Sequence, residues 1–400
     1  MEVTEGGSIL SPKGFRAGWA VCGIKTTSGS PDVALIVSDA PAAGAGVFTT
    51  NRFAAAPVQW CRSILPGDGM RAIVANAGNA NACTGQRGLA DARATAELVS
   101  QMIGCERGAV AVASTGIIGR PLPMERLMEG VRAAHASLSS NQAAARGAER
   151  AIMTTDTRPK ACAVRAEIGD KPFCIGGMAK GSGMIAPNLA TMLVFMTTDA
   201  RAPAALLQRA LKRAADATFN LITVDGDMST NDSVLMLANG ASGAVVPTSG
   251  RGAKVFRDAL HCVMADLSRQ LVRDGEGATK LIEITVSGAR STAQAETAAR
   301  AIANSLLVKC AIHGGDPNWG RIVCAAGYSG AELDAGKVRL DIGSVTVFEN
   351  GLPTGSDAAA ELAGGEVAVR LNLAAGSRQA TVLTCDLSKA YVDINAEYHT

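Results

Sequence analysis

Residues 180–196 read KGSGMIAPNLATMLVFM, a glycine-rich half that runs directly into an apolar, β-branched half. Glycine permits backbone conformations that other residues avoid, whereas Pro187 fixes one φ angle and lacks an N–H. The run from Thr191 to Met196 predicts a buried strand. A loop therefore leads straight into a strand, and Thr191 stands at the junction.

A threonine at this junction has two interpretations. The structural one is β-propensity combined with a local hydrogen bond. In the functional one, the Thr191 hydroxyl attacks the preceding carbonyl, at Ala190, and an N-to-O shift followed by hydrolysis frees the Thr191 α-amine. With an ordinary pKa of about 7.7–8.0, much of that amine is neutral near pH 7 and can act as the base for its own hydroxyl. The residue pattern alone leaves both interpretations open.

The segment closely resembles the self-processing segment of the ornithine acetyltransferase family, the glutamate N-acetyltransferases of arginine biosynthesis. Residues 180–196 show no departure from that pattern, and the resemblance covers nearly the whole chain. Residues 274–279 carry it almost as specifically, followed by residues 154–160 and the C-terminal tail. The resemblance implies that the bond between Ala190 and Thr191 is cut and that Thr191 is the nucleophile.

Composition indicates a folded protein without the sequence features of nucleic-acid-binding, membrane-spanning or secreted proteins. Hydrophobic residues make up 48% of the chain and charged residues 18%, with a net charge of +2 spread evenly along the sequence. Few aromatic residues and no basic cluster argue against nucleic-acid binding. No apolar run approaches the ~20 residues of a membrane span. The N-terminus lacks the pattern of a signal or transit peptide, so we expect a cytoplasmic protein.

Cysteine and histidine patterns indicate no metal site, no redox pair and no Ser–His pair. The ten cysteines are scattered singly, as buried small hydrophobes are in a reducing cytosol, and the four histidines are far apart. Residues 225–232 carry three carboxylates but lack the spacing and closing Glu of a calcium loop. A turn with a capping role is the better prediction for this segment.

Alternating periodicities predict interleaved helices and strands. Strands are expected at residues 32–37, 46–50, 71–75, 109–113, 161–166, 172–178 and 280–287, with strands and glycine turns after residue 321. Helices are expected at residues 88–104, 123–138, 141–153, 202–219 and 252–273, and from a capping box of Ser291 with Gln294 towards residue 306. The Asn- and Gly-rich residues 76–85 predict a loop. This order fits a layered α/β sandwich of two domains or two halves.

The predicted strand at 109–113 ends at Ser114, Thr115 and Gly116, where backbone N–H groups and hydroxyls suit an oxyanion. A Thr-Gly pair is common in proteins and indicates nothing by itself. The resemblance implies that Thr115 and Gly116 form an oxyanion hole. It also implies a carboxylate, Glu276, for the ammonium group of the substrate. The full set of substrate contacts implied by the resemblance is Thr154, Lys180, Thr191, Glu276, Asn395 and Thr400. Residues 313–321 receive a supporting structural role only.

The resemblance implies an α/β sandwich in two lobes, cut into two chains. An α chain of residues 1–190 would carry the oxyanion hole, and a β chain of residues 191–400 would begin with the nucleophile; two of each would form a heterotetramer. The implied reaction moves acetyl from N2-acetylornithine to glutamate through an acyl-Thr191, without a metal or organic cofactor. Acetyl-CoA stays open as a second donor. The alternatives are an N-terminal-nucleophile aminopeptidase or amidase, and an uncut amino-acid-binding protein.

Overall fold

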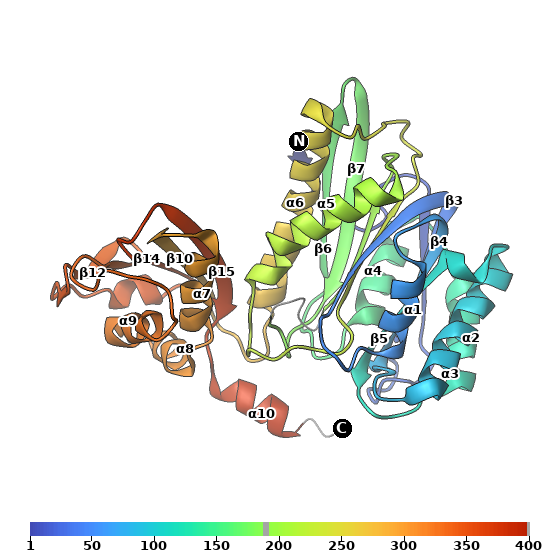
Figure 1. Cartoon of the computed structure of the whole chain (residues 1–400). Helices are drawn as coiled ribbons and strands as arrows, with labels where there is room; N and C mark the ends of the chain where they lie inside the picture. The colour runs from blue at the N-terminus through green and yellow to red at the C-terminus, as the bar shows by residue number, and fades with distance from the viewer. Residues whose placement is uncertain (187–191, 398–400) are drawn as a thin grey trace.

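The computed structural model describes residues 1–186 and 192–397. In these residues the chain forms two lobes, each built on its own sheet (Figure 1). The larger sheet has the strand order β1-β6-β7-β8-β9-β3-β4-β5, with β2 paired to β3. Its strands are β1 (Glu2–Val3), β2 (Phe15–Ala20), β3 (Val33–Phe48), β4 (Gly67–Asn79), β5 (Val110–Ile117), β6 (Lys160–Ile168), β7 (Lys171–Lys180), β8 (Leu193–Thr198) and β9 (Ser233–Ala238).

Strand β8 lies in the interior of the larger sheet, and all of its residues are buried. It runs antiparallel to β7, with Lys180 opposite Leu193, and parallel to β9, with Leu193 opposite Ser233. Its side chains alternate between two cores: Val194 and Met196 join one, while Leu193 and Phe195 join the other. Because both faces are covered, residues 193–196 form a continuous apolar run, as expected for the strand predicted at residues 191–196. The strand begins at Leu193 in the described residues and continues two residues beyond the prediction, to Thr198.

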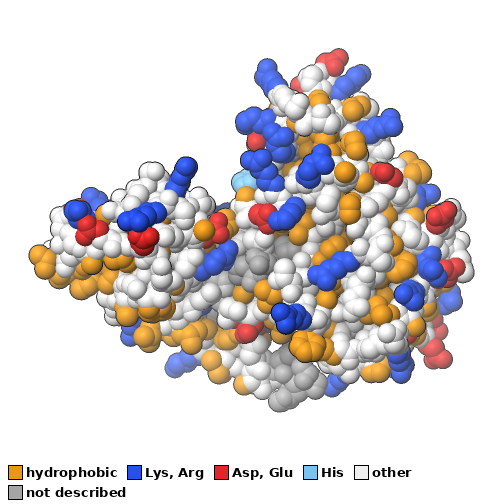
Figure 2. Space-filling view, in the orientation of Figure 1, with side chains coloured by type: hydrophobic (Ala, Val, Ile, Leu, Met, Phe, Trp, Pro, Cys, Tyr) orange, Lys and Arg blue, Asp and Glu red, His pale blue; other side chains and the backbone are white. Residues whose placement is uncertain are grey.

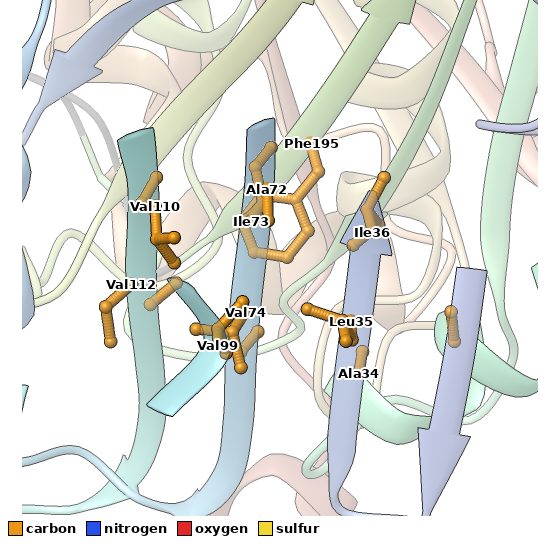
Figure 3. Close-up of a cluster of buried hydrophobic side chains, with 14 of the residues drawn as sticks. Ala34, Leu35, Ile36, Ala72, Ile73, Val74, Val99, Val110, Val112 and Phe195 are labelled. Atoms are coloured by element: carbon orange, nitrogen blue, oxygen red, sulfur yellow. The ribbon is translucent and has the colours of Figure 1, made fainter. Parts of the chain in front are cut away.

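Helices cover both faces of the larger sheet. One core joins the sheet to α1 (Ala56–Ile64), α2 (Gly85–Ile103), α3 (Met124–Ala136) and α4 (Gln142–Ile152); Figure 3 shows part of it, with Phe195 beside Ile73. The other core includes residues of α5 (Ala204–Asp216) and α6 (Gly250–Arg273). The result is a layered α/β arrangement, as the alternating periodicities predict.

The smaller lobe is a second sheet with its own core. The strand order is β13-β12-β11-β14-β10-β15, and β10 pairs parallel with β14 and antiparallel with β15. Its elements are β10 (Leu281–Ala289), α7 (Thr292–Ala303), α8 (Leu306–His313), α9 (Trp319–Gly327), β11 (Arg339–Ile342), β12 (Val345–Glu349), β13 (Leu352–Pro353), β14 (Glu366–Asn372) and β15 (Arg378–Cys385). A last helix, α10 (Lys389–Glu397), leaves this lobe and extends below the larger one (Figure 1). The prediction of a mixed α/β fold in two lobes is confirmed.

Several predicted boundaries are wrong, and the differences in the strands come from their pairing with distant strands. The strands at 32–37 and 46–50 are one strand, β3, which pairs first with β2 and β4 and then, after register shifts, with β9. Strand β4 continues through Asn79 into the predicted loop, and β5 continues through Gly116 to Ile117, because the two strands pair in parallel there. The helix from Ser291 ends at Ala303, after which α8 begins. Helix α9, whose N-terminus is capped by the Asn318 side chain, and helix α10 lie where only strands and turns were expected.

Charge is less evenly distributed in space than along the chain. On the face shown in Figure 2, Lys and Arg side chains gather over the upper part of the larger lobe. Helices α5 and α6 line one groove with basic side chains, among them Arg213, Lys254 and Arg257. Among the described residues, no helix is long and apolar enough to cross a membrane.

Candidate active site

A cavity of about 130 Å³ lies where the ends of β5 and β7 meet the residues before β9. Its lining comes from segments between residues 80 and 395, and α10 supplies the last of them. Six residues that the resemblance implies are in this lining: Thr115, Gly116, Thr154, Lys180, Glu276 and Asn395. Ala190, Thr191 and Thr400 lie outside the described residues, and the roles assigned to all nine stay predictions.

Lys180, the last residue of β7, links two of these candidates. Its side chain is 2% exposed, and its ammonium group donates to Thr154 Oγ1 at 2.7 Å and to Thr115 Oγ1 at 3.2 Å. Burial lowers the pKa of Lys180, an effect that the nearby carboxylate of Asp156, at 3.9 Å, opposes. The cavity therefore has a buried cation beside two hydroxyls, an arrangement suited to a carboxylate or a developing negative charge.

The Asp156 carboxylate binds the segments that carry Lys180 and Thr154. Its Oδ1 atom accepts from the backbone N–H of Gly181 at 2.6 Å and from Lys160 at 2.6 Å, and its Oδ2 atom accepts from the N–H of Thr154 at 3.0 Å. Burial alone would raise the pKa of the Asp156 carboxyl, but the ammonium groups of Lys180 and Lys160 hold it at about 2. A single ionised carboxylate thus orients both the end of β7 and the loop that carries Thr154.

The same network reaches the end of α6. Lys160 also donates to Asp274 Oδ2 at 2.5 Å, and both side chains are almost completely buried. Two buried lysines, Lys160 and Lys180, are therefore paired with two buried aspartates, which lowers the cost of burying each charge. Asp274 lies two residues before Glu276, so the network also fixes the start of the loop that carries this carboxylate.

Glu276 also lines the cavity, at a point where three segments meet. Its N–H donates to Ser182 O at 2.9 Å, and its Oε2 atom accepts from Asn395 Nδ2 at 2.9 Å. Gly183 packs directly against the carboxylate, since a Cβ built at that position would overlap it. The glycine-rich approach to the processing segment thus has a steric reason in addition to backbone freedom.

Gly116 is constrained in a different way. Its φ angle is +130°, a region that L side chains rarely adopt, and a Cβ there would overlap the backbone of Gly78. The ends of β4 and β5 can approach this closely only with glycine at position 116. The neighbouring Thr115 is 4% exposed and lines the same cavity.

Two carboxylates bind the described residues on either side of positions 187–191. Asp225 accepts from the N–H groups of Met184 and Ile185 at 2.6 and 2.9 Å, and Asp232 accepts from the N–H of Met192 at 3.1 Å. Burial raises the pKa of both carboxyls, that of Asp232 well above its ordinary value. Residues 225–232 thus form a turn that caps neighbouring backbone, in line with the interpretation drawn from their spacing.

The sequence interpretation missed Asp156, Asn231 and Asp232 as parts of this site. Asp156 lies within residues 154–160, which carry the resemblance, but no local pattern indicates that its side chain reaches Gly181. Among the described residues, no three His, Cys, Asp or Glu side chains are grouped as a metal site would require.

Comparisons with known proteins agree on one family. A family model described as the ArgJ family matches residues 16–400. The arginine biosynthesis bifunctional protein ArgJ of Symbiobacterium thermophilum is 50% identical over 400 residues, covering 98% of this chain and 99% of that protein. The protein of the same name in Geobacter sulfurreducens is 49% identical, covering 98% of this chain and 100% of that protein. A solved ornithine acetyltransferase from Mycobacterium tuberculosis, complexed with ornithine, is 42% identical; it covers 47% of this chain and 99% of its own, with a TM-score of 0.45.

Proposed function

Because the chain belongs to the ArgJ family, we propose that it moves the acetyl group of N2-acetylornithine to glutamate in arginine biosynthesis. The observation that carries this function is the 50% identity to a bifunctional ArgJ protein across 98% of the chain. It favours a glutamate N-acetyltransferase over an aminopeptidase or a binding protein. The word "bifunctional" in the relatives' names supports acetyl-CoA as a second acetyl donor.

The proposed transfer has two halves. The Thr191 Oγ atom attacks the acetamide carbon of acetylornithine, and its proton passes to the Thr191 α-amine. The C–N bond breaks, ornithine leaves with that proton on its amine, and an acetyl ester remains on Thr191. The amine of glutamate then attacks the ester, N-acetylglutamate leaves, and Thr191 regains its proton.

Charges in the cavity suit a substrate with the two ends of an amino acid. Lys180 offers a buried ammonium group for a carboxylate, and Glu276 offers a carboxylate for an ammonium group. Thr154, Asn395 and, at the end of the chain, Thr400 complete the proposed substrate contacts. Thr115 and Gly116 would stabilise the oxyanion that forms when the acetamide carbon is attacked.

The nucleophile needs a free α-amine, so the bond between Ala190 and Thr191 must be cut first. The proposed α chain, residues 1–190, and β chain, residues 191–400, would then pair as a heterotetramer in the cytoplasm. Ten free cysteines are compatible with a reducing compartment.

The function is tested by incubating the purified protein with N2-acetylornithine and glutamate and measuring both products by mass spectrometry. Ornithine and N-acetylglutamate are expected in equal amounts, with little acetate. Release of acetate that does not depend on glutamate would instead support the N-terminal-nucleophile amidase. A parallel reaction with acetyl-CoA and glutamate tests the second donor.

The nucleophile is tested by Thr191→Ala. This variant should remain a single chain by intact mass and should show no transfer, because the attacking hydroxyl is absent. Thr198→Ala is the matched control, because Thr198 is a buried threonine of β8 whose hydroxyl donates to Cys174 O at 2.7 Å. The Thr198→Ala protein should lose some stability but should still be cut. Cutting of Thr191→Ala after Ala190 would refute the proposed nucleophile.

A further inference from the structure

Asn231 makes an unusual set of hydrogen bonds beside the cavity. Its side chain is buried, and its Nδ2 atom donates to Ala80 O at 2.6 Å and to Ser114 O at 2.8 Å. Ala80 directly follows β4, and Ser114 directly precedes Thr115 on β5. A single amide therefore joins the ends of the two strands that meet at Gly116.

The orientation of this amide is well determined. The carbonyl oxygens of Ala80 and Ser114 can only accept, so the NH₂ group must face them, and the Oδ1 atom is left to accept from the hydroxyl of Thr230 at 2.6 Å. The backbone N–H of Asn231 donates to Ser229 Oγ at 3.0 Å, which holds the turn itself. Both carbonyls and the amide are thereby paired in a buried place, where unpaired groups would be costly.

The next residue makes the complementary contact. Asp232 Oδ1 accepts from the N–H of Met192 at 3.1 Å, and Ser233 N–H donates to Met192 O at the same distance. Met192 follows Thr191 in the sequence. Two consecutive side chains thus bind different parts of the site: Asn231 binds the strand ends beside Thr115 and Gly116, and Asp232 binds the start of β8.

From this geometry we propose that Asn231 is a positioning residue of the transfer reaction, which fixes the strand end beside Thr115 and Gly116 relative to Met192, the residue that follows the proposed nucleophile in the sequence. The inference rests on the proposed function. Donors that stabilise an oxyanion must lie within a fraction of an ångström of its position, and a displacement of ~1 Å can cost about 100-fold in rate. Removing the amide frees the end of β5 to shift relative to Met192.

The chain offers a matched control at the other end of the same strand. Asn239 follows β9, and its Nδ2 atom also donates to two backbone carbonyls, Lys13 O at 2.9 Å and Gly14 O at 3.1 Å. It is separated from Asn231 by the whole of β9, about 20 Å of strand at ~3.3 Å per residue. Asn239→Ala therefore also removes two side-chain hydrogen bonds to backbone carbonyls, at a less buried position away from the cavity.

The test compares kcat and KM for acetylornithine in the cut forms of Asn231→Ala, Asn239→Ala and the unmodified protein. For Asn231→Ala, kcat should fall about 100-fold while KM changes less than about threefold, since the substrate's charged ends are bound elsewhere. Asn239→Ala should keep kcat within about threefold, although it also loses two hydrogen bonds. Equal kcat values for the two variants would overturn the proposal.

If Asn231→Ala is cut slowly or folds poorly, the same measurements are made on Asn231→Ser, which keeps one hydroxyl donor. A smaller loss of kcat with unchanged KM is expected, and a kcat equal to that of the unmodified protein would overturn the proposal. Combining Asn231→Ala with Thr115→Ala separates positioning from general stability. If Asn231 acts through the oxyanion hole, the double variant should lose little more than the worse single one, whereas multiplied losses would contradict it.

Failure of the proposed function would be seen separately, as absence of transfer by the unmodified protein. The positioning role of Asn231 would then still be tested by the rate at which the chain is cut, measured by intact mass. We expect Asn231→Ala to cut at least tenfold more slowly than Asn239→Ala, because the attack on the Ala190 carbonyl also forms an oxyanion. Equal cutting rates would refute the role of Asn231.

Discussion

Gly183 and Glu276 show how one residue sets the shape of the cavity. The Glu276 carboxylate accepts a hydrogen bond from Asn395 Nδ2, and Gly183, which has no side chain, leaves room for the same carboxylate. Since Gly183 lacks a positive φ angle, its importance lies in the space that it leaves and not in backbone strain. The carboxylate is the end of a flexible side chain and can move if that space is filled.

Gly183→Ala should therefore raise KM for acetylornithine about tenfold, the loss expected when a hydrogen bond to a charged group is weakened. The melting temperature should change little, because the displaced group is a side-chain end. Gly108→Ala is the control, since a Cβ at that position meets nothing within 4 Å. An unchanged KM would show that Glu276 does not bind the substrate.

Helix α4 carries a buried acid that makes the stability of the protein depend on pH. Glu149 lies on its buried face, and burial raises the pKa of the carboxyl to about 7, although Arg146 and Arg150 oppose the shift. Below the unfolded pKa of 4.5, Glu149 is protonated in both states. As pH rises towards 7, the unfolded state ionises first, so the free energy of unfolding falls.

The free energy of unfolding should fall by on the order of 3 kcal/mol across this window. Glu149→Gln should remove most of this loss and should be more stable than the unmodified protein at pH 8. The measurement is urea unfolding at several pH values. Glu129→Gln, an exposed change on α3, serves as the control, and a matching pH dependence in Glu149→Gln and Glu129→Gln would contradict the assignment.

At the scale of the whole molecule, the two proposed chains share one core. Strands β1 to β7 precede Thr191, while β8 and β9 follow it, and β8 is paired on both sides. The core under α5 and α6 joins Val164 and Ile175 of the first part to Val194 and Phe256 of the second. Separating the parts would expose this apolar surface to water, so a cut chain stays assembled.

The smaller lobe takes part in the site through α10, which has no buried residue. Ser388 Oγ donates to Gly277 O at 2.6 Å at its start, and Asn395 reaches Glu276 near its end. Removing residues 389–400 should therefore raise KM by at least tenfold and leave the melting temperature nearly unchanged. Asn395→Ala should show a smaller rise, and an unchanged KM in the truncated protein would exclude substrate contacts from the tail.

Local patterns predicted the elements whose contacts are local or strongly periodic. The helix predicted at 141–153 is α4, capped by Asn141, whose side chain accepts from the N–H of Ala144 at 2.8 Å. The capping contact between Ser291 and Gln294 is present as well, at 3.2 Å. By contrast, residues 76–79 were predicted as a loop but belong to strand β4. They form sheet because they pair with β5, about forty residues later in the chain, and no local pattern indicates that pairing.

The sequence by itself determined the family, the α/β class and the candidate residues, because these depend on motifs and periodicities that are read along the chain. Only the tertiary structure brought Lys180 to Thr115, Asp156 to Gly181 and Asn231 to Ser114, pairs separated by 25 to 117 positions. Such contacts depend on strand order and register, which a stretch of sequence does not specify alone. For that reason the residues that hold the site in place became visible only in the folded chain.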